Sequence, residues 1–355
     1  MINVGIIGLG WWGMEAHLPA MLAHKDVCVL AIQKRSLPEA QSIAKRYSIP
    51  HCYTDSYELL KLAALDAVII CSTPNRHYTE ARCALEAGLH VLLEKPMTFT
   101  YREAQELVNL AKIKKVQFLI SCPWHYTAHA IDARNKIKAQ SLGELQILSL
   151  WMTNYTLGFY NSKPWHEKFL LDKTSLEYKA PIIEPGVSSY SDLSVAGGGN
   201  IYCQLSHVFA YIGFLTGAEP VEIYADVNNL GSSVDIINTI QIRFSNNLLA
   251  NISSAGIHAK LKRQFEIRLL GSDGLLELDL WNGTYAIDCI DGTSHKLPDL
   301  LPNEVYPQFQ PAINLIECIL NKEENGSSAV YGLYAMRLIE GAYASYKSKK
   351  PYIFT

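Results

Sequence analysis

The sequence predicts an α/β protein with an N-terminal doubly wound parallel sheet and a C-terminal α+β domain built on a large open, mainly antiparallel sheet. A glycine-rich turn at residues 8–13 joins a strand pattern to a helix pattern at the start of the chain. Strand and helix patterns then alternate to about residue 122, which favours parallel strands with right-handed crossovers. Between residues 221 and 290, consecutive strand patterns are separated by turn signals, which is typical of antiparallel sheets.

The chain has 355 residues, more than one ordinary hydrophobic core organises, so two domains are expected. We place the parallel domain at residues 1–122 and the α+β domain at residues 123–355. In the first domain, expected strands span residues 2–8, 27–32, 66–71, 88–93 and 116–121, and expected helices run from the glycine turn to about residue 24 and over 37–47, 76–87 and 102–112. Thr100 and Glu103 form a capping-box pattern before the last of these helices.

The pattern changes after Pro123. The expected order is a helix at 130–138, a strand at 145–153, an irregular aromatic-rich stretch at 154–199, a helix at 200–215, the strands of 221–290, and closing helices at 308–320 and 331–346. Consecutive strands of this kind predict one antiparallel sheet in the second domain.

Composition argues against several classes of protein. Hydrophobic residues make up 49% of the chain and charged residues 18%, which is typical of a folded globular protein. The formal net charge is −3 and no Lys/Arg-rich run is present, which argues against nucleic acid and anionic membranes as partners. No apolar run is long enough to span a bilayer, and a strand pattern beginning at Ile2 leaves no room for a signal peptide. We therefore expect a cytoplasmic protein.

The cysteine and histidine patterns do not favour a metal site. The eight cysteines are scattered and form no C-x-x-C pair, so we interpret them as buried thiols in a reducing compartment. His125 and His129 are four residues apart, but no H-E-x-x-H pattern or acidic partner accompanies them. No metal is therefore expected.

The turn Gly8-Leu9-Gly10-Trp11-Trp12-Gly13 has the G-x-G-x-x-G spacing of Rossmann dinucleotide-binding domains. Gly8 permits the tight turn, Gly10 lets backbone N–H groups approach a pyrophosphate, and Gly13 allows close packing of helix on strand. The following helix would face the phosphates with its positive end. We therefore expect these glycines, with Trp11 and Trp12, to bind the cofactor.

The second strand ends at Gln33-Lys34-Arg35-Ser36. NAD sites usually place an acidic residue near this point, about 20 residues beyond the glycines, to bind the ribose 2′-hydroxyl. Two cations and a hydroxyl suit a 2′-phosphate instead. Lys34, Arg35 and Ser36 thus predict a preference for NADP(H), with NAD(H) as the alternative if the two cations only form a solvated loop.

A polar loop, Ser72-Thr73-Pro74-Asn75, follows the buried strand at 66–71. Because the carboxyl ends of parallel strands border the ligand crevice, we expect this loop to line the cofactor. His77 is grouped with the loop, although its position alone is typical of a helix surface.

Two further motifs complete a family pattern. Glu94-Lys95-Pro96 follows the strand at 88–93, and Gly197-Gly198-Gly199 precedes a helix that carries His207. With the glycine turn, the chain length and the domain order, they resemble the Gfo/Idh/MocA oxidoreductases, named for glucose–fructose oxidoreductase, inositol dehydrogenase and rhizopine-catabolism proteins. The resemblance spans nearly the whole chain but does not specify a substrate.

The resemblance implies roles for the E-K-P segment. In the family its lysine reaches the substrate hydroxyl beside the nicotinamide, so we expect Lys95 to do so here, with Glu94 at the cofactor. The physical case agrees, since a cation at the end of a parallel strand can stabilise a developing alkoxide. The Lys95–Pro96 bond is expected to be cis, as in such family members.

The helix after residue 199 carries a polar stripe beside its apolar one. The polar stripe contains Asn200, Cys203, Gln204 and His207, and it lacks Lys and Glu, which favours a cleft over a solvated surface. In the family this helix commonly carries D-x-x-x-H, with histidine as the proton acceptor. His207 matches that pattern, whereas Cys203 occupies the aspartate position and cannot stabilise an imidazolium as a carboxylate does. We therefore expect Asn200, Cys203 and Gln204 to bind substrate and His207 to act as the base.

Aromatic residues supply the remaining candidates. Trp124 and His125 follow the last strand of the first domain, where many family members have a substrate-site segment, and His125 is expected to join a proton relay. Tyr155 begins the aromatic stretch, and its ring can stack on the apolar face of a sugar. The other aromatic residues of this region are Trp151, Phe159, Tyr160, Trp165, Tyr178 and Tyr190. They either fill the core beneath a long loop or form a substrate wall, a lid or an inter-subunit arm.

Together these features predict reversible hydride transfer between NADP(H) and a secondary alcohol or hemiacetal carbon of a sugar, sugar derivative or cyclitol. Lys95 and His207 are the expected catalytic residues. Two alternatives stay open: a redox-neutral reaction such as glycosidic cleavage with a tightly held cofactor, and a non-enzymatic sugar or dinucleotide sensor. Strands at 236–244 and 264–270 carry apolar residues on more than one side, so we expect a homodimer or homotetramer through the C-terminal sheet.

Overall fold

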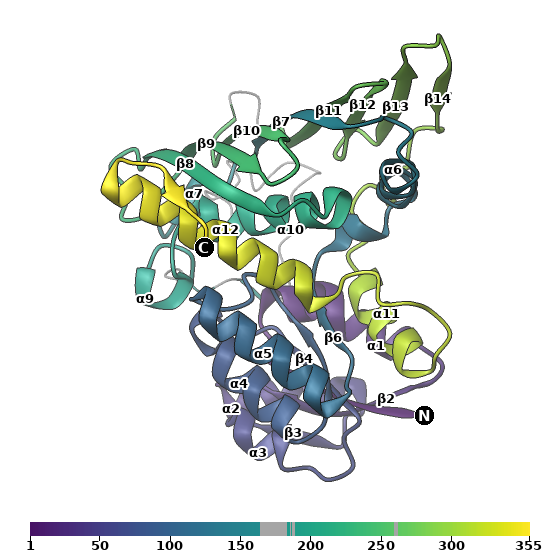
Figure 1. The fold of residues 1–355 in the computed structure, drawn as a ribbon. Coiled ribbons are helices and arrows are strands. Elements are labelled where there is room, and N and C mark those ends of the chain that lie inside the picture. Colours follow the sequence, from purple (N-terminus) through teal and green to yellow (C-terminus); the bar gives the residue numbers. More distant parts are fainter. Residues whose placement is uncertain (164–182, 185, 187–188, 259–261) are drawn as a thin grey trace, which may run out of the picture. The chain divides into compact units, whose positions relative to one another are not determined.

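The computed structural model describes residues 1–163, 183–184, 186, 189–258 and 262–355 (Figure 1). Contacts divide the described residues into two compact units. The first unit draws on residues 1–123, 183–184, 186 and 308–336, and the second on residues 124–163, 189–258, 262–307 and 337–355.

The first unit contains a six-stranded parallel sheet of the Rossmann type, as the sequence predicts. Its strands, in the spatial order β3-β2-β1-β4-β5-β6, are β1 (Ile2–Ile7), β2 (Val27–Gln33), β3 (His51–Tyr53), β4 (Ala67–Ile70), β5 (His90–Leu93) and β6 (Phe118–Ile120). The helical elements are η1 (Gly13–His17), α1 (Leu18–Ala23), α2 (Leu37–Tyr47), α3 (Ser56–Leu60), α4 (Pro74–Glu86), α5 (Tyr101–Lys114) and α11 (Gln310–Ile319). The sequence patterns missed β3 and α3, because both are short and carry too few apolar residues to show a period.

Helix α11 belongs to the core of the first unit, although we expected it in the second domain. Ala312, Leu315 and Ile316 are fully buried in the same hydrophobic cluster as Val4 and Ile6 of β1. A single division of the chain after residue 122 therefore does not describe the packing, because α11, near the C-terminus, packs in the core of the first unit. A boundary between separately folding domains stays a prediction.

The second unit contains a nine-stranded sheet in the order β14-β13-β12-β11-β7-β10-β9-β8-β15. The strands are β7 (Leu145–Thr153), β8 (Pro220–Asn228), β9 (Ile237–Phe244), β10 (Leu249–Ala255), β11 (Gln264–Gly271), β12 (Gly274–Asp279), β13 (Thr284–Cys289), β14 (Ser294–Lys296) and β15 (Tyr352–Ile353). The expected antiparallel order is interrupted once, because β7 lies between β10 and β11 and pairs with β10 in parallel. The sheet is therefore mixed, mainly antiparallel.

Helix α10 (Ser206–Thr216) packs on one face of this sheet (Figure 1), where the ring of Tyr211 lies 5.8 Å from that of Phe265 on β11. The expected helix at 200–215 does not begin as an α-helix. Its first turn is the π-helix η3 (Ile201–Leu205), a distortion that occurs often at functional sites. The other helical elements are η2 (Pro123–Tyr126), α6 (Ala128–Lys138), α7 (Leu157–Tyr160), α9 (Leu193–Ala196) and α12 (Ala329–Ser348), whose residues up to Met336 are assigned to the first unit.

Candidate functional site

The glycine turn of the first unit has the backbone that a dinucleotide requires. Gly8 has φ of +76°, and a Cβ there would lie 2.3 Å from the backbone of Ser72. A Cβ on Gly13 would lie 2.8 Å from Cys71 Sγ, whereas the nearest atom to a Cβ on Gly10 would be 3.7 Å away. The two outer glycines are therefore packed against the loop after β4, and Gly10 leaves room for a ligand to approach.

Gln33, at the end of β2, forms a hydrogen bond with this glycine turn. The Gly8 N–H donates to Gln33 Oε1 at 3.0 Å, and Gln33 Nε2 donates to the Thr54 carbonyl at 2.7 Å. Gln33 is buried, so its amide holds the glycine turn in place. This role of Gln33 could not be predicted from the sequence pattern, which shows only that no acidic residue stands at this point.

The three residues that we assigned to a 2′-phosphate differ in their surroundings. Lys34 Nζ forms an ion pair with Glu39 at 2.8 Å and also donates to the Leu9 carbonyl at 3.3 Å. Ser36 is the N-cap of α2, where its hydroxyl accepts from the Glu39 N–H at 3.5 Å. Arg35 is exposed. Of the three, Arg35 has the side chain with most freedom to meet an anion.

Glu94 and Lys95 lie at the end of β5. The buried Glu94 carboxylate accepts from His17 Nε2 at 2.8 Å and from the Lys95 backbone N–H at 3.2 Å. Burial raises the pKa of Glu94, but the His17 hydrogen bond and charge and the Lys95 charge more than offset it, and the pKa falls below its usual value. Lys95 is half-buried, and the Lys95–Pro96 bond is cis, as expected. His17, which ends η1 and is fully buried, belongs to no motif that would have indicated this contact from the sequence.

His77 is buried, so the interpretation as a helix-surface residue is wrong. Its Nδ1 lies 2.8 Å from the Pro96 carbonyl and its Nε2 lies 3.0 Å from the Ser72 carbonyl. The ring therefore connects the E-K-P segment to the loop after β4. The side chain of Thr73 donates to Asn75 Oδ1 at 2.7 Å where α4 begins.

His207 lies in α10 of the second unit, and its buried ring meets the ring of Trp124 edge-on at 5.2 Å. Cys203 and Gln204, one turn earlier, are half-buried. Cys203 packs against the hydrophobic cluster of Tyr160, Val234 and Ile236. At the position where the family commonly has aspartate, the thiol thus contacts this cluster and accepts from Gln204 Nε2 at 3.5 Å.

Asn200 is fully buried, which disagrees with a substrate-binding role. Its Nδ2 donates to Asn238 Oδ1 and to Ser254 Oγ, each at 2.8 Å, and its Oδ1 accepts from Tyr160 at 3.3 Å. The side chain therefore ties the start of η3 to strands β9 and β10. Polar periodicity alone cannot distinguish such a buried network from a ligand cleft.

The two residues after β6 are also enclosed. Trp124 is buried against the rings of Phe265, Trp281 and Tyr306 at 4.8–5.3 Å. His125 is 1% exposed and stacks on Phe214 at 4.4 Å, so the structure does not support a proton relay through this ring. Trp124 thus lies inside an aromatic cluster and is not exposed to a ligand, contrary to the substrate-binding role expected for it.

The aromatic stretch contributes mainly to packing. Phe159 and Tyr160 are buried, which agrees with the core interpretation, while Trp151 lies on β7 and is exposed. Tyr155, the proposed stacking residue, is half-buried. Trp165 and Tyr178 lie outside the described residues.

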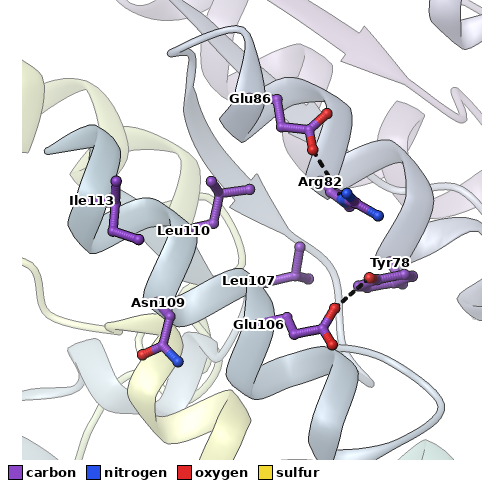
Figure 2. Close-up of a pocket in the computed structure, with 8 residues that line it drawn as sticks. All are labelled: Tyr78, Arg82, Glu86, Glu106, Leu107, Asn109, Leu110 and Ile113. Carbon is purple, nitrogen blue, oxygen red and sulfur yellow. Dashed lines mark hydrogen bonds and ion pairs between the residues drawn. The ribbon is translucent and has the colours of Figure 1, made fainter.

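A hollow of the first unit lies between α4 and α5 (Figure 2). Its polar side chains pair with one another: Tyr78 donates to Glu106 at 2.6 Å, and Arg82 donates to Glu86 at 2.9 Å. The hollow contains none of the expected site residues, and we assign it no ligand.

Among the described residues, no group of three or more His, Cys, Asp or Glu side chains is placed to hold a metal ion. In the same part of the chain, no helix is both long enough and apolar enough to cross a membrane.

Comparison with known families agrees with this geometry. Residues 2–121 match the model of an oxidoreductase family with an NAD-binding Rossmann fold, which defines the class of the first unit. Residues 176–277 match the GFO/IDH/MocA C-terminal domain. The chain therefore belongs to the Gfo/Idh/MocA oxidoreductase family, as its motifs indicated.

Individual relatives are more distant. The chain is 30% identical over 223 residues to an uncharacterized oxidoreductase of Synechocystis, covering 61% of this chain and 52% of that protein. It is 31% identical over 150 residues to the D-glucoside 3-dehydrogenase of Escherichia coli, covering 41% and 42%. The chain thus spans about half the length of the curated relatives it matches.

Solved structures show the same fold. The aldose-aldose oxidoreductase of Caulobacter crescentus superposes with a TM-score of 0.77 at 21% identity, over 99% of both chains. GenD2 from gentamicin A biosynthesis, solved in complex with NAD, superposes with a TM-score of 0.79 at 16% identity, over 100% of this chain and 96% of that one.

Proposed function

We propose that this protein transfers a hydride between NADP(H) and a secondary alcohol or hemiacetal carbon of a sugar, sugar derivative or cyclitol. The observation that carries the proposal is Lys95 at the end of β5, directly after a glutamate held by His17. Two similar proteins support the substrate class, since one is named a glucoside dehydrogenase and the other an aldose-aldose oxidoreductase.

The first unit fits a dinucleotide by its backbone. Gly8, Gly10 and Gly13 would hold the pyrophosphate, because Gly10 leaves open space while the other two hold the turn tightly. The loop at Ser72–Asn75 and the exposed Arg35 would bind the remainder of the cofactor. When bound, the nicotinamide supplies or accepts the hydride.

The catalytic roles belong to Lys95 and His207. The Lys95 ammonium donates a hydrogen bond to the substrate hydroxyl and stabilises the alkoxide that forms as the hydroxyl loses its proton. The His207 imidazole accepts this proton during oxidation and returns it during reduction. Gln204 donates to a second hydroxyl of the substrate. Because Cys203 cannot orient His207 through charge, the ring of Trp124 holds the imidazole by packing.

The Lys95→Ala variant tests this function. We expect turnover to fall by about 10²–10⁴-fold, because a positioned proton-transfer or charge-stabilising group contributes that much. The Kd for NADPH should stay nearly unchanged. The measurement is NADPH absorbance during turnover with a panel of aldoses, inositols and nucleotide sugars. Lys112→Ala, at an exposed position on α5, is the matched control, and unchanged turnover of Lys95→Ala would contradict the proposal.

The cofactor preference has a separate test. We expect NADPH to bind more tightly than NADH, and Arg35→Ala to reduce that preference by about tenfold, since a charge-assisted hydrogen bond to the 2′-phosphate is lost. Both affinities can be measured by fluorescence titration of the purified protein. Arg102→Ala, an exposed arginine on α5, should leave the preference unchanged. Tighter binding of NADH by the unmodified protein would overturn the assignment.

The cytoplasmic location stays a prediction.

A further inference from the structure

We propose that the substrate carries an anionic group, a carboxylate or a phosphate, and that Arg263 of the second unit binds it. The inference deepens the proposed function and rests on it, because it places the substrate beside the aromatic cluster that packs on His207. Arg263 belongs to none of the motifs that the sequence analysis identified.

Arg263 contacts two aromatic rings through its guanidinium group. It precedes β11, and its guanidinium carbon lies 4.9 Å from the ring centroid of Trp281 and 5.3 Å from that of Tyr155. A guanidinium that lies over a ring face binds it through its flat side and keeps its N–H donors at the edge of its plane. Those donors match the two oxygens of a carboxylate or phosphate.

Arg263 differs from a neighbouring arginine in its charged contacts. Arg263 is exposed, and within the described residues no carboxylate forms an ion pair with it. Arg268, which lies on β11 itself, pairs with Glu277 at 3.0 Å. Arg268 thus belongs to a surface ion pair, whereas Arg263 is an exposed cation over two aromatic rings.

The neighbouring sequence strengthens the positive charge. Lys260, Lys262 and Arg263 lie within four residues of the sequence and the next acidic residue is Glu266, although the chain as a whole has a net charge of −3. A local cation excess in a slightly acidic protein attracts an anionic ligand and raises the rate at which it arrives.

The aromatic cluster connects Arg263 to the catalytic histidine. Trp281 packs on Trp124 at 5.3 Å, and Trp124 packs on His207 at 5.2 Å. Tyr306 stacks on Trp281 at 5.6 Å, and both rings are half-buried. Because both residues are partly exposed, their rings can contact the apolar side of a sugar while Arg263 binds its charged substituent.

Matched ligands test the proposal without requiring turnover. D-glucuronate, D-glucose 6-phosphate and D-glucose, with the corresponding galactose and mannose compounds, are titrated calorimetrically into the NADPH-bound protein. We expect at least one anionic member to bind at least tenfold more tightly than its neutral parent, and the uronate and phosphate arms show which anion is preferred. The proposal is overturned if no anionic compound binds more tightly than its parent.

Variants assign the preference to Arg263. Arg263→Gln should abolish the difference between the anionic compound and its parent, Arg263→Lys should retain part of it, and Arg268→Gln should leave it unchanged. Equal loss of affinity for charged and neutral ligands in Arg263→Gln would show a structural role only and overturn the proposal. Thermal unfolding confirms that each variant is folded. These experiments measure only binding. Normal turnover of Lys95→Ala would therefore contradict the proposed hydride transfer without changing the measured preference of Arg263 for an anionic ligand.

Discussion

Two histidines hold the segment around Lys95. His17 donates to Glu94, the residue before Lys95, and His77 bonds the carbonyl of Pro96, the residue after it. His17 comes from the helix after the glycine turn and His77 from α4 after the cofactor loop. The position of Lys95 thus depends on both elements that border the dinucleotide.

The His77 ring has a hydrogen-bonding conflict. Both neighbours, the Pro96 and Ser72 carbonyls, can only accept, and a neutral imidazole donates from one nitrogen. Burial lowers the pKa of His77, opposed by the two carbonyls and by the nearby carboxylates of Glu80 and Glu94. The net shift is downward, so the folded ring is neutral at neutral pH. As the pH falls, the unfolded chain takes up the proton first.

His77→Gln should therefore be destabilising in a pH-dependent way. A histidine with a lowered folded pKa stabilises the fold fully above its ordinary pKa of about 6.5, and this stability is lost as the pH falls through the lowered value. We expect the variant to lose about 1–3 kcal/mol at neutral pH, the cost of an unmet buried hydrogen bond. Because glutamine does not titrate, the difference from the unmodified protein should shrink towards about pH 5.

Urea denaturation at several pH values measures that difference. His51→Gln is the matched control, since His51 is exposed on β3 of the same unit, and its effect should be small at every pH. A difference for His77→Gln that grows towards acid would mean that the fold favours the imidazolium, contrary to the argument.

At the scale of elements, the helix that carries His207 is fastened at its start by a buried carboxylate. The Gly199 and Ile201 N–H groups donate to Asp235 at 2.9 and 2.8 Å, and Tyr343 also donates to it. The first N–H groups of a helix lack intrahelical partners and favour negative charge. The close approach of Asp235 also explains why residue 199 is a glycine, because a Cβ there would lie 2.1 Å from the Asp235 carbonyl oxygen.

Gly199→Ala should destabilise the protein by about 3 kcal/mol, because the new methyl group meets backbone that cannot move aside. Gly217→Ala, at the other end of the same helix, is the comparison. Gly217 has φ of +59° and nothing within 4 Å of an added Cβ, so only backbone strain of about 1 kcal/mol is expected. Chemical denaturation measures both, and equal losses would remove the role assigned to the contact with Asp235.

Some features of the fold and of the candidate site could be predicted from the sequence, and others could not. The parallel domain was predictable because its buried strands are apolar runs, and Lys95 was predictable because a motif surrounds it. Periodicity placed a helix at 200–215 but could not show the π turn, whose apolar spacing is nearly the same. Arg263 and Trp281 could not be paired with Tyr155 in advance, since β7 enters the sheet beside β11 only on folding.

At the scale of the whole molecule, one face of the large sheet is covered by α10 and the other carries an exposed apolar row. Ile147 of β7 pairs with Leu249 of β10 on one side and Leu270 of β11 on the other. The three side chains are 48%, 50% and 38% exposed, and Trp151 on the same face of β7 is 48% exposed. A contiguous apolar row on a sheet face is typical of a protein interface.

We therefore expect light scattering to give two or four times the mass of one chain. Ile147→Asp should shift the protein towards the monomer, because a charge in the middle of the row has to be desolvated in any interface that covers it. The secondary structure of the variant should be unchanged, since the side chain is half exposed in the single chain. Ile113→Asp, at a 75% exposed position on α5, controls for the added charge and should not change the mass. If the unmodified protein is a monomer, or if Ile147→Asp leaves its mass unchanged, this face of the sheet is not the interface.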